Sequence, residues 1–362
     1  MTTIVFILAS AQDPRSFKRI REFIGKGYEV EVYAFDRGLS TKNKPTDFEI
    51  RIIGAYTEEL SYLKRIPIIR KGLAEVKRNI RGRKVLLYAM GLDIAFLSYL
   101  VIHKPFVFEE ADLVHTYIGN ATIRKAMERI DRFIVRKSRL SVFTSDGFVQ
   151  YHYGSNPPSN IVVVPNKLSP KVLDVPLMEK HKFDPGNIQI GFVGGFRFDS
   201  IYNFTLVFLK HFPQHEFHVF GLLDDKEQKE TLESYPNFHF HGVFKNPDDL
   251  PGIYSQLDLA LCTYDTRFEN VRYAEPNKIY ESIYFETPII VSSGTFLSQR
   301  VEELGIGFSI DPFSEEEICR FVEGVSEAEI AKRQESAARI GKQYAIDNNE
   351  ELFEKLTKII TD

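Results

Sequence analysis

A lysine and a glutamate three residues apart, in the segment EPNKIYES, have the plainest capacity for binding chemistry in this sequence. Pro276 suits the first turn of a helix, where free N–H groups favour an anion, and Lys278 would add a compact positive charge. Glu281 would lie one turn further along the same face, and its carboxylate can accept hydrogen bonds from sugar hydroxyls. The pattern predicts a site for a phosphate beside a ribose, as in a nucleotide; an ordinary surface ion pair is the alternative.

A second candidate for anion binding follows the strand-like run IQIGFVGG. Gly194 and Gly195 would let backbone N–H groups approach a ligand closely, and Arg197 offers a bidentate guanidinium to a phosphate. The spacing is not that of the Gly-x-Gly-x-x-Gly dinucleotide motif. A tight turn followed by a surface arginine explains this stretch equally well.

Length and composition limit the classes of protein to consider. The chain has 362 residues, 43% of them hydrophobic and 27% charged, which favours a globular protein of two domains. Its formal net charge of -4 argues against a nucleic-acid partner. The two cysteines, Cys262 and Cys319, cannot build a disulfide framework, and this predicts a reducing, cytoplasmic location.

Two apolar stretches resemble membrane segments but are interpreted otherwise. Residues 1–10 lack the basic start and small-residue cleavage site of an export signal, so they are expected to form a buried strand. Residues 85–102 are long enough to cross a bilayer, but they contain Asp93 and a break at Gly91. We expect a strand, a turn and a buried helix there.

Short runs rich in Val, Ile and Phe alternate with stretches of helical length along the chain. Strands are predicted at residues 3–9, 28–35, 105–115, 140–145, 160–165, 188–195, 216–222, 238–243, 257–263 and 287–293. Such runs are typical of parallel strands that crossover helices bury on both faces. The sequence therefore predicts an α/β doubly wound fold that occurs twice, with a boundary near residue 175.

Four segments of the second half also carry a family resemblance. The third of them contains a Pro-x-Lys-x-Tyr-Glu signature. They are residues 190–221, 240–264, 275–293 and 301–311. In order and spacing they resemble the nucleotide-sugar half of GT-B glycosyltransferases, most of all family 4. The resemblance implies two Rossmann-like domains facing a central cleft. Residues 1–175 would bind the acceptor and 176–345 the donor, and a last helix over 346–362 would pack back on the first domain.

The resemblance also implies roles for the residues already singled out. Lys278 and Arg197 would contact the donor diphosphate as the catalytic cations, and Glu281 would contact the ribose. The donor-binding set is Gly194, Gly195, Arg197, Asn277, Lys278, Tyr280 and Glu281. The family's reaction retains the anomeric configuration and needs no cofactor or metal, and the chain has no Asp-x-Asp motif for a metal diphosphate.

This chain departs from the family pattern at two positions. Many relatives have a glutamate that faces the donor sugar where this chain has Tyr273, with Glu275 nearby but out of register. Relatives also place a His-Asp pair where this chain has Ala111 and Asp112. Asp112 is therefore the expected acceptor-facing catalytic residue, and these departures motivate the alternative of a module that binds nucleotide sugars without catalysis.

Further polar residues follow the predicted strand over 105–115, where open α/β sheets place ligands. Glu110 and Asp112, two residues apart, would share a face in extended chain. His115 is open to a functional or a structural role, and Arg15 to an anion contact or to a place at the start of a helix. His239 and His241 would share a strand face, but no further ligands complete a metal site around them.

Residues 61–84 contain nine Lys or Arg and a single acidic residue, interleaved with Leu, Ile and Val. A basic amphipathic segment of this kind suits an anionic membrane surface. A solvated basic face, or contact with RNA, is the alternative.

The sequence thus predicts a retaining glycosyltransferase that moves a sugar from a nucleotide-diphosphate donor to a glycan or lipid-linked acceptor. A role in surface polysaccharide synthesis, with peripheral association at the inner face of the cell membrane, is expected. A nucleotide-sugar 2-epimerase of the same fold is the second alternative.

Overall fold

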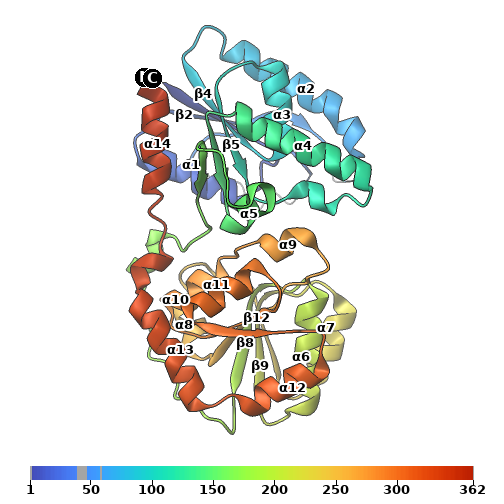
Figure 1. Ribbon diagram of the computed structural model, residues 1–362, viewed down its shortest axis with the longest axis vertical. Coiled ribbons are helices and arrows are strands. Elements are labelled where there is room, and N and C mark those ends of the chain that lie inside the picture. Colours follow the sequence, from blue (N-terminus) through green and yellow to red (C-terminus); the bar gives the residue numbers. More distant parts are fainter. Residues whose placement is uncertain (1, 39–46, 58, 362) are drawn as a thin grey trace. The chain divides into compact units, whose positions relative to one another are not determined.

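The computed structural model describes residues 2–38, 47–57 and 59–361, and these form two compact units (Figure 1). Unit 1 comprises Met1–Val164 and Asn349–Asp362, and unit 2 comprises Pro165–Asn348. Residues 165–175, which the sequence analysis assigned to the first domain, thus belong to unit 2. The reason is local packing: Leu168 and Val172 are part of the unit 2 core, and the Leu168 N–H donates to Ala345 O at 3.0 Å.

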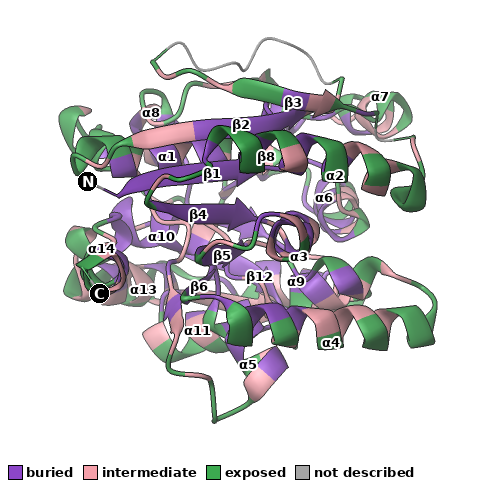
Figure 2. Cartoon of the chain, turned by 90° about the horizontal axis from the view of Figure 1, so that it is seen from above, coloured by how far each residue is buried: buried purple, intermediate pink, exposed green. Residues whose placement is uncertain are grey.

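Unit 1 is built on a parallel sheet with the strand order β3-β2-β1-β4-β5-β6-β7. The strands are β1 (Thr3–Leu8), β2 (Val30–Asp36), β3 (Arg51–Ala55), β4 (Val85–Met90), β5 (Phe106–Glu110), β6 (Leu140–Phe143) and β7 (Ile161–Val163). Figure 2 shows that β1 and β4, at the centre, are buried along their whole length. Helices cover both faces of such a sheet, so its central strands consist of continuous apolar runs.

The helices of unit 1 are α1 (Pro14–Gly25), α2 (Tyr62–Asn79), α3 (Leu92–Val101), α4 (Ala121–Lys137), α5 (Asp146–Tyr153) and α14 (Glu350–Thr361), with a short 3-10 helix η2 (Val114–Tyr117). Three of the unit 1 helices, α1, α4 and α5, begin at a residue whose side chain caps them. The carboxylate of Asp13 accepts hydrogen bonds from the N–H groups of Arg15 and Ser16 at the start of α1. Asn120 caps α4 in the same way, and such caps satisfy N–H groups that have no partner inside the helix.

The last helix, α14, belongs to unit 1 although the whole of unit 2, Pro165–Asn348, precedes it in the chain. Leu352, Phe353 and Leu356 are buried in the core of unit 1. The ring of Phe353 lies 5.1 Å from that of Phe23 in α1, and Figure 1 shows α14, in red, beside α1. The apolar face of α14 thus closes one side of the first sheet.

Unit 2 is built on a second parallel sheet with the order β10-β9-β8-β11-β12-β13. The strands are β8 (Gln189–Gly195), β9 (Glu216–Leu222), β10 (Phe238–Gly242), β11 (Leu259–Cys262), β12 (Ile289–Ser292) and β13 (Gly307–Ile310). The sequence analysis did not predict β3 or β13. Both are short edge strands that are only partly buried, so they lack the apolar run that marks a central strand.

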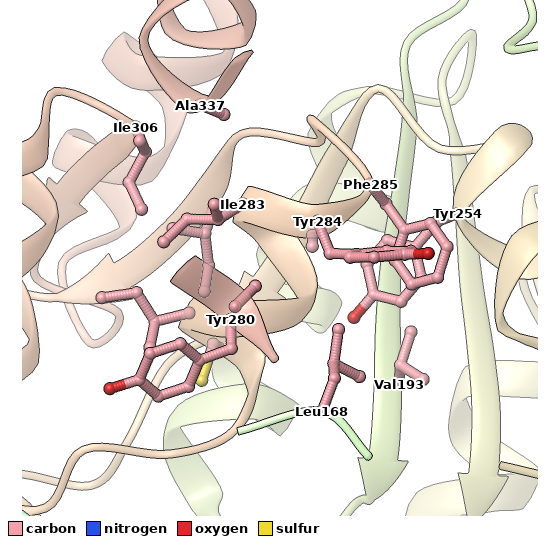
Figure 3. Packing of buried hydrophobic residues seen from close by; sticks show 14 of the residues in the cluster. Leu168, Val193, Tyr254, Tyr280, Ile283, Tyr284, Phe285, Ile306 and Ala337 are labelled. Atoms are coloured by element: carbon pink, nitrogen blue, oxygen red, sulfur yellow. The ribbon is translucent and has the colours of Figure 1, made fainter. Parts of the chain in front are cut away.

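The helices of unit 2 alternate with its strands. They are α6 (Asp199–His211), α7 (Lys226–Glu233), α8 (Leu250–Ser255), α9 (Glu269–Tyr273), α10 (Lys278–Tyr284), α11 (Phe296–Leu304), α12 (Glu315–Gly324) and α13 (Glu327–Ile340), with 3-10 helices η3 (Pro170–Asp174) and η4 (Lys342–Ala345). Figure 3 shows the core under α10, where the rings of Tyr254 and Phe285 stack at 4.7 Å and Tyr280 lies apart from them.

The apolar run over residues 85–102 forms β4 and α3, as predicted. Gly91 joins them with a φ of 94°, a conformation that glycine adopts without strain. None of the described helices is long and apolar enough to cross a membrane.

Candidate functional site

Gly194 and Lys278, both singled out by the sequence analysis, meet at the carboxyl end of β8. A Cβ added to Gly194 would lie 3.8 Å from Cε of Lys278, so the lysine side chain passes over this glycine. Gly194 has a φ of 141°. On the neighbouring strand β9, a Cβ at Gly221 would lie only 1.8 Å from the carbonyl oxygen of Gly194. The close approach of the two backbones at the carboxyl ends of β8 and β9 therefore requires glycine.

Lys278 is held by Glu281, as the spacing of three residues predicts. The ammonium Nζ donates to Glu281 Oε2 at 2.6 Å, and the lysine side chain is 13% exposed. The carboxylate of Glu281 is fully buried and also accepts hydrogen bonds from Tyr254 Oη at 2.5 Å and Asn277 Nδ2 at 2.6 Å. Glu281 thus fixes the position of Lys278, and this pair is not the exposed surface ion pair considered as the alternative.

Burial keeps two groups beside this pair, the Tyr254 hydroxyl and the Cys262 thiol, in their protonated, neutral forms. It raises the pKa of the Tyr254 hydroxyl well above its usual value, and the charge of Glu281 raises that pKa further. Burial likewise raises the pKa of the Cys262 thiol to about 12, against the opposing effect of Lys278. Tyr254 is therefore a hydrogen-bond donor and Cys262 a neutral thiol, not a thiolate nucleophile.

The helix starts two residues later than the sequence analysis expected. The helix begins at Lys278 and not at Pro276, and it has only seven residues. The N–H groups of Tyr280 and Glu281 both donate to Asn277 O, at 3.0 and 3.1 Å. These two N–H groups are therefore not available to an anion, and the positive charge at this site comes from the Lys278 side chain.

The remaining predicted donor residues lie in different surroundings. Gly195, the last residue of β8, and Arg197, two residues further on, are both exposed, and the Arg197 guanidinium lies 5.4 Å from the centre of the Phe198 ring. No contact joins Arg197 to Lys278 among the described residues. The Tyr280 hydroxyl donates to the Glu275 carboxylate, on the side of α10 where the Lys167 ammonium lies 5.4 Å from the Tyr280 ring. Tyr280 is thus buried on a different side of α10 from the Lys278 ammonium.

In unit 1, Asp112 lies just beyond the carboxyl end of β5 and its side chain is 49% exposed. Arg15, at the start of α1, approaches it at 3.6 Å, an exposed ion pair that contributes little stability. The prediction that Glu110 and Asp112 share a face is wrong. The strand ends at Glu110, which is buried, so the alternation of an extended chain does not continue to Asp112.

His115 is fully buried, and three further side chains that the sequence analysis did not connect with it lie nearby. They are Glu110, Asp131 and His152, and together with His115 they form what we call the His–carboxylate cluster. No local pattern reveals this set, because its members come from four separate elements. Tyr254 was missed for the same reason: its contact with Glu281 joins residues 27 positions apart.

The histidines of unit 2 form hydrogen bonds with one another and with polar neighbours. His218 Nδ1 lies 3.0 Å from His241 Nε2, and His218 Nε2 lies 2.8 Å from Gln189 Oε1. The amide oxygen can only accept, so His218 donates from Nε2 and accepts at Nδ1 from His241. His239 instead pairs with Glu216 at 2.6 Å. His218 is therefore held in the neutral form.

This arrangement predicts acid sensitivity of unit 2. Burial and the neighbouring histidines lower the pKa of His218 to about 3, whereas an unfolded histidine titrates near 6.5. The unfolded state then binds more protons, so stability is lost as the pH falls from about 6.5 toward 3. At pH 5 the loss is about 2 kcal/mol. We expect His218→Gln to reduce the difference in Tm between pH 7.5 and 5.0; an unchanged difference would contradict the assignment.

Comparison with known proteins agrees with this architecture. Residues 192–348 match the family described as glucosyltransferase 3-like, C-terminal domain. The succinoglycan biosynthesis protein ExoL of Rhizobium meliloti (strain 1021) is 21% identical over 343 residues, which cover 86% of this chain and 81% of ExoL.

Solved structures of the same fold cover nearly the whole chain. The Anabaena protein HepE in complex with UDP and glucose aligns with a TM-score of 0.69 and 14% identity, over 99% of this chain and 100% of HepE. A UDP-N-acetylglucosamine 2-epimerase aligns with a TM-score of 0.57 and 13% identity, over 95% and 94% of the two chains. The predicted fold and the predicted resemblance are confirmed. The chain has the GT-B fold, and residues 192–348 are similar to the C-terminal domain of the glucosyltransferase 3-like family.

Proposed function

We propose that this protein transfers a sugar from a nucleotide-diphosphate donor to a hydroxyl group of a glycan or lipid-linked acceptor, in the synthesis of a surface polysaccharide. The observation that carries the proposal is Lys278, which Glu281 holds over Gly194 at the carboxyl end of β8. Open α/β sheets bind their ligands at this end. The similarity to ExoL and to HepE bound to UDP and glucose supports the same class of substrate.

Lys278 suits the leaving group of such a reaction. Breaking the anomeric bond builds negative charge on the diphosphate, and a preorganised cation lowers the barrier by stabilising that charge. An ammonium has three N–H donors, and one of them bonds Glu281, so two remain for phosphate oxygens. Arg197, exposed beyond the same strand, would supply a second, bidentate contact.

The donor site proposed here consists of Gly194, Gly195, Arg197, Asn277, Lys278 and Glu281, with Tyr280 supporting it from the core. In this arrangement Glu281 and Asn277 position the lysine. A ribose contact by Glu281 remains a prediction, because its buried carboxylate already accepts three hydrogen bonds.

We further propose that the anomeric configuration is retained and that no metal takes part in the transfer. The neutral Cys262 thiol beside Lys278 does not suit a covalent intermediate. In this scheme Lys278 and Arg197 hold the leaving phosphate. That phosphate accepts the proton of the acceptor hydroxyl. Asp112, exposed at the carboxyl end of the first sheet, is the residue proposed to face the acceptor.

A panel of donors tests the function directly. We expect UDP-sugars, GDP-sugars or dTDP-sugars to raise the Tm of the purified protein, because a ligand that binds the folded state stabilises it by mass action. Product analysis with the stabilising donor then distinguishes the alternatives: transfer or slow donor hydrolysis supports the proposal, and an epimerised donor supports a 2-epimerase. Stabilisation with neither product indicates a binding module, and a failure of every donor to bind contradicts the whole assignment.

The basic segment over residues 61–84 is proposed to bring the enzyme to an anionic membrane surface. Most of it forms α2, whose exposed cations include Lys64, Arg70, Lys71, Lys77 and Arg78. Leu63, in the first turn, is 78% exposed, so an apolar side chain accompanies these charges. Anionic lipids attract such a segment by about 1 kcal/mol for each basic residue near the surface.

Charge reversal of α2 provides the test. We expect the triple variant Arg70→Glu, Lys71→Glu, Arg78→Glu to bind phosphatidylglycerol-containing vesicles about 100-fold more weakly in co-sedimentation, since three attractive charges are lost. The matched control reverses three exposed lysines of unit 2, Lys210, Lys226 and Lys332, and should bind as the wild type does. Equal binding by both variants would show that α2 is only a solvated basic face.

A further inference from the structure

The His–carboxylate cluster brings together four potential metal ligands from four elements of unit 1. They are Glu110 at the end of β5, His115 in η2, Asp131 in α4 and His152 in α5. One ligand atom from each lies within 4.8 Å of the others. Figure 1 shows α4, α5 and the end of β5 in the same part of unit 1. The proposed sugar transfer makes no use of this cluster.

Burial of these side chains is close to complete. The side chains of His115, Asp131 and His152 are 0% exposed, and that of Glu110 is 2% exposed. Carboxylates and imidazoles in such surroundings need partners, because an unsatisfied polar group costs free energy when it leaves water.

Within the described residues, the one hydrogen bond between members of the cluster is a long one, between His152 Nε2 and Glu110 Oε1 at 3.5 Å. Both ring nitrogens of His115 and both carboxylate oxygens of Asp131 have no hydrogen-bond partner there. Glu110 Oε2 and His152 Nδ1 likewise have no hydrogen-bond partner among the described residues. Six unpartnered atoms in one buried cluster point to a ligand that these side chains share.

The distances within the cluster suit a shared cation better than direct hydrogen bonds. His152 Nε2 lies 3.5 Å from Glu110 Oε1 and 3.6 Å from Asp131 Oδ2. His115 Nδ1 lies 3.6 Å from the same Asp131 oxygen. Hydrogen bonds to carboxylates are shorter than this, at about 2.7–2.9 Å. Ligands of tetrahedral zinc, with bonds of about 2.0–2.1 Å, lie roughly 3.4 Å from one another.

The charge of the cluster leads to the same conclusion. With both carboxylates ionised, Glu110 and Asp131 would place two negative charges in this buried space, and a divalent cation would neutralise them. Arg132 of α4, whose charge acts on His152, bonds Glu128 at 2.6 Å. A buried pair of carboxylates without a countercharge is unfavourable, so an ion is the simplest way to stabilise both.

We propose that the His–carboxylate cluster binds one divalent transition-metal ion, with Zn²⁺ as the preferred ion, and that this ion fastens β5 to α4 and α5. Imidazole and carboxylate together suit such ions, and zinc binds among the more tightly of them. Four protein ligands leave no open coordination position, so the ion stabilises unit 1 and does not activate a substrate. The site is independent of the donor site in unit 2.

Metal analysis of the whole protein tests this inference. The protein should be produced without a histidine tag, dialysed, and examined by elemental analysis for zinc, manganese, iron and cobalt. We expect about one ion per chain, and removal of that ion by a strong chelator should lower the Tm by several degrees, reversibly on addition of ZnCl₂. A chain free of metal whose Tm responds neither to chelator nor to added Zn²⁺ would overturn the proposal. It would favour a proton shared between Glu110 and Asp131 instead.

Conservative ligand variants locate the ion. We expect His152→Gln and Asp131→Asn to bind Zn²⁺ about 100-fold more weakly or not at all, because each removes one ligand. The matched controls His239→Gln and Glu216→Gln disrupt the partly buried histidine–carboxylate pair of unit 2 and should keep the full metal content. Loss of metal in the controls alone would contradict the assignment. Visible absorption of the Co²⁺-substituted wild type reports the coordination geometry even where a variant does not fold.

Discussion

Replacing Lys278 by alanine is expected to lower kcat/KM for sugar transfer roughly 100- to 1000-fold, the effect of removing one preorganised group that stabilises developing charge. The donor-induced rise in Tm should also disappear, because the same ammonium would hold the diphosphate of the bound donor. Steady-state kinetics and thermal melts with the best donor of the panel measure both effects.

Loss of Lys278 also removes a partner of the buried Glu281, so stability needs its own control. Glu281 would keep its bonds from Tyr254 and Asn277, and we expect the apo Tm to fall only by a few degrees. The double variant Lys278→Met, Glu281→Gln removes both charges and should recover the apo Tm without recovering transfer. Exposed Lys210→Ala serves as the neutral comparison. A Lys278→Ala protein that still transfers sugar at the wild-type rate would place the donor elsewhere.

Replacing Gly221 by alanine is expected to destabilise unit 2 by about 3–5 kcal/mol and to lower its Tm by roughly 10 °C. Two effects add. The φ of Gly221 is 137°, which an alanine adopts only with strain, and the new Cβ would lie 1.8 Å from Gly194 O. Relief of that overlap must move the end of β8, where Lys278 crosses Gly194, so donor binding should weaken as well.

Gly195→Ala is the matched control for this variant. No atom lies within 4 Å of a Cβ built at Gly195, so its Tm should stay within about 2 °C of the wild type. Donor affinity of the same variant reports how closely a phosphate approaches this backbone. Wild-type melting of Gly221→Ala would mean that β8 and β9 do not approach as closely as the structure indicates.

Much of the fold can be predicted from local sequence patterns. Central strands such as β1 and β4 are continuous apolar runs because both of their faces are covered. Asp93 and Gly91 marked the turn and helix that follow β4, and a bilayer span was excluded on that basis. The edge strands β3 and β13 were missed because a strand with one open edge needs less apolar sequence.

Only some contacts of the proposed donor site were likewise predictable from local sequence. A spacing of three residues in a helix brings Lys278 to Glu281 whatever surrounds them, so this contact was predictable. The burial of Glu281 under Tyr254, and the separation of Tyr280 from Lys278, depend on how α8 packs against α10. No residue pattern within α10 encodes that packing.

Local sequence thus determined the alternation of strands and helices, the glycine turn after β8 and the lysine–glutamate pair, because each depends on residues within a few positions of one another. Tertiary packing alone decided the end of unit 1 at Val164 and the gathering of Glu110, His115, Asp131 and His152, whereas the return of α14 was expected from the family resemblance and not from any local pattern. These features join residues that are distant in the chain, and their free energy comes from burial and charge compensation that exist only once the sheet has formed.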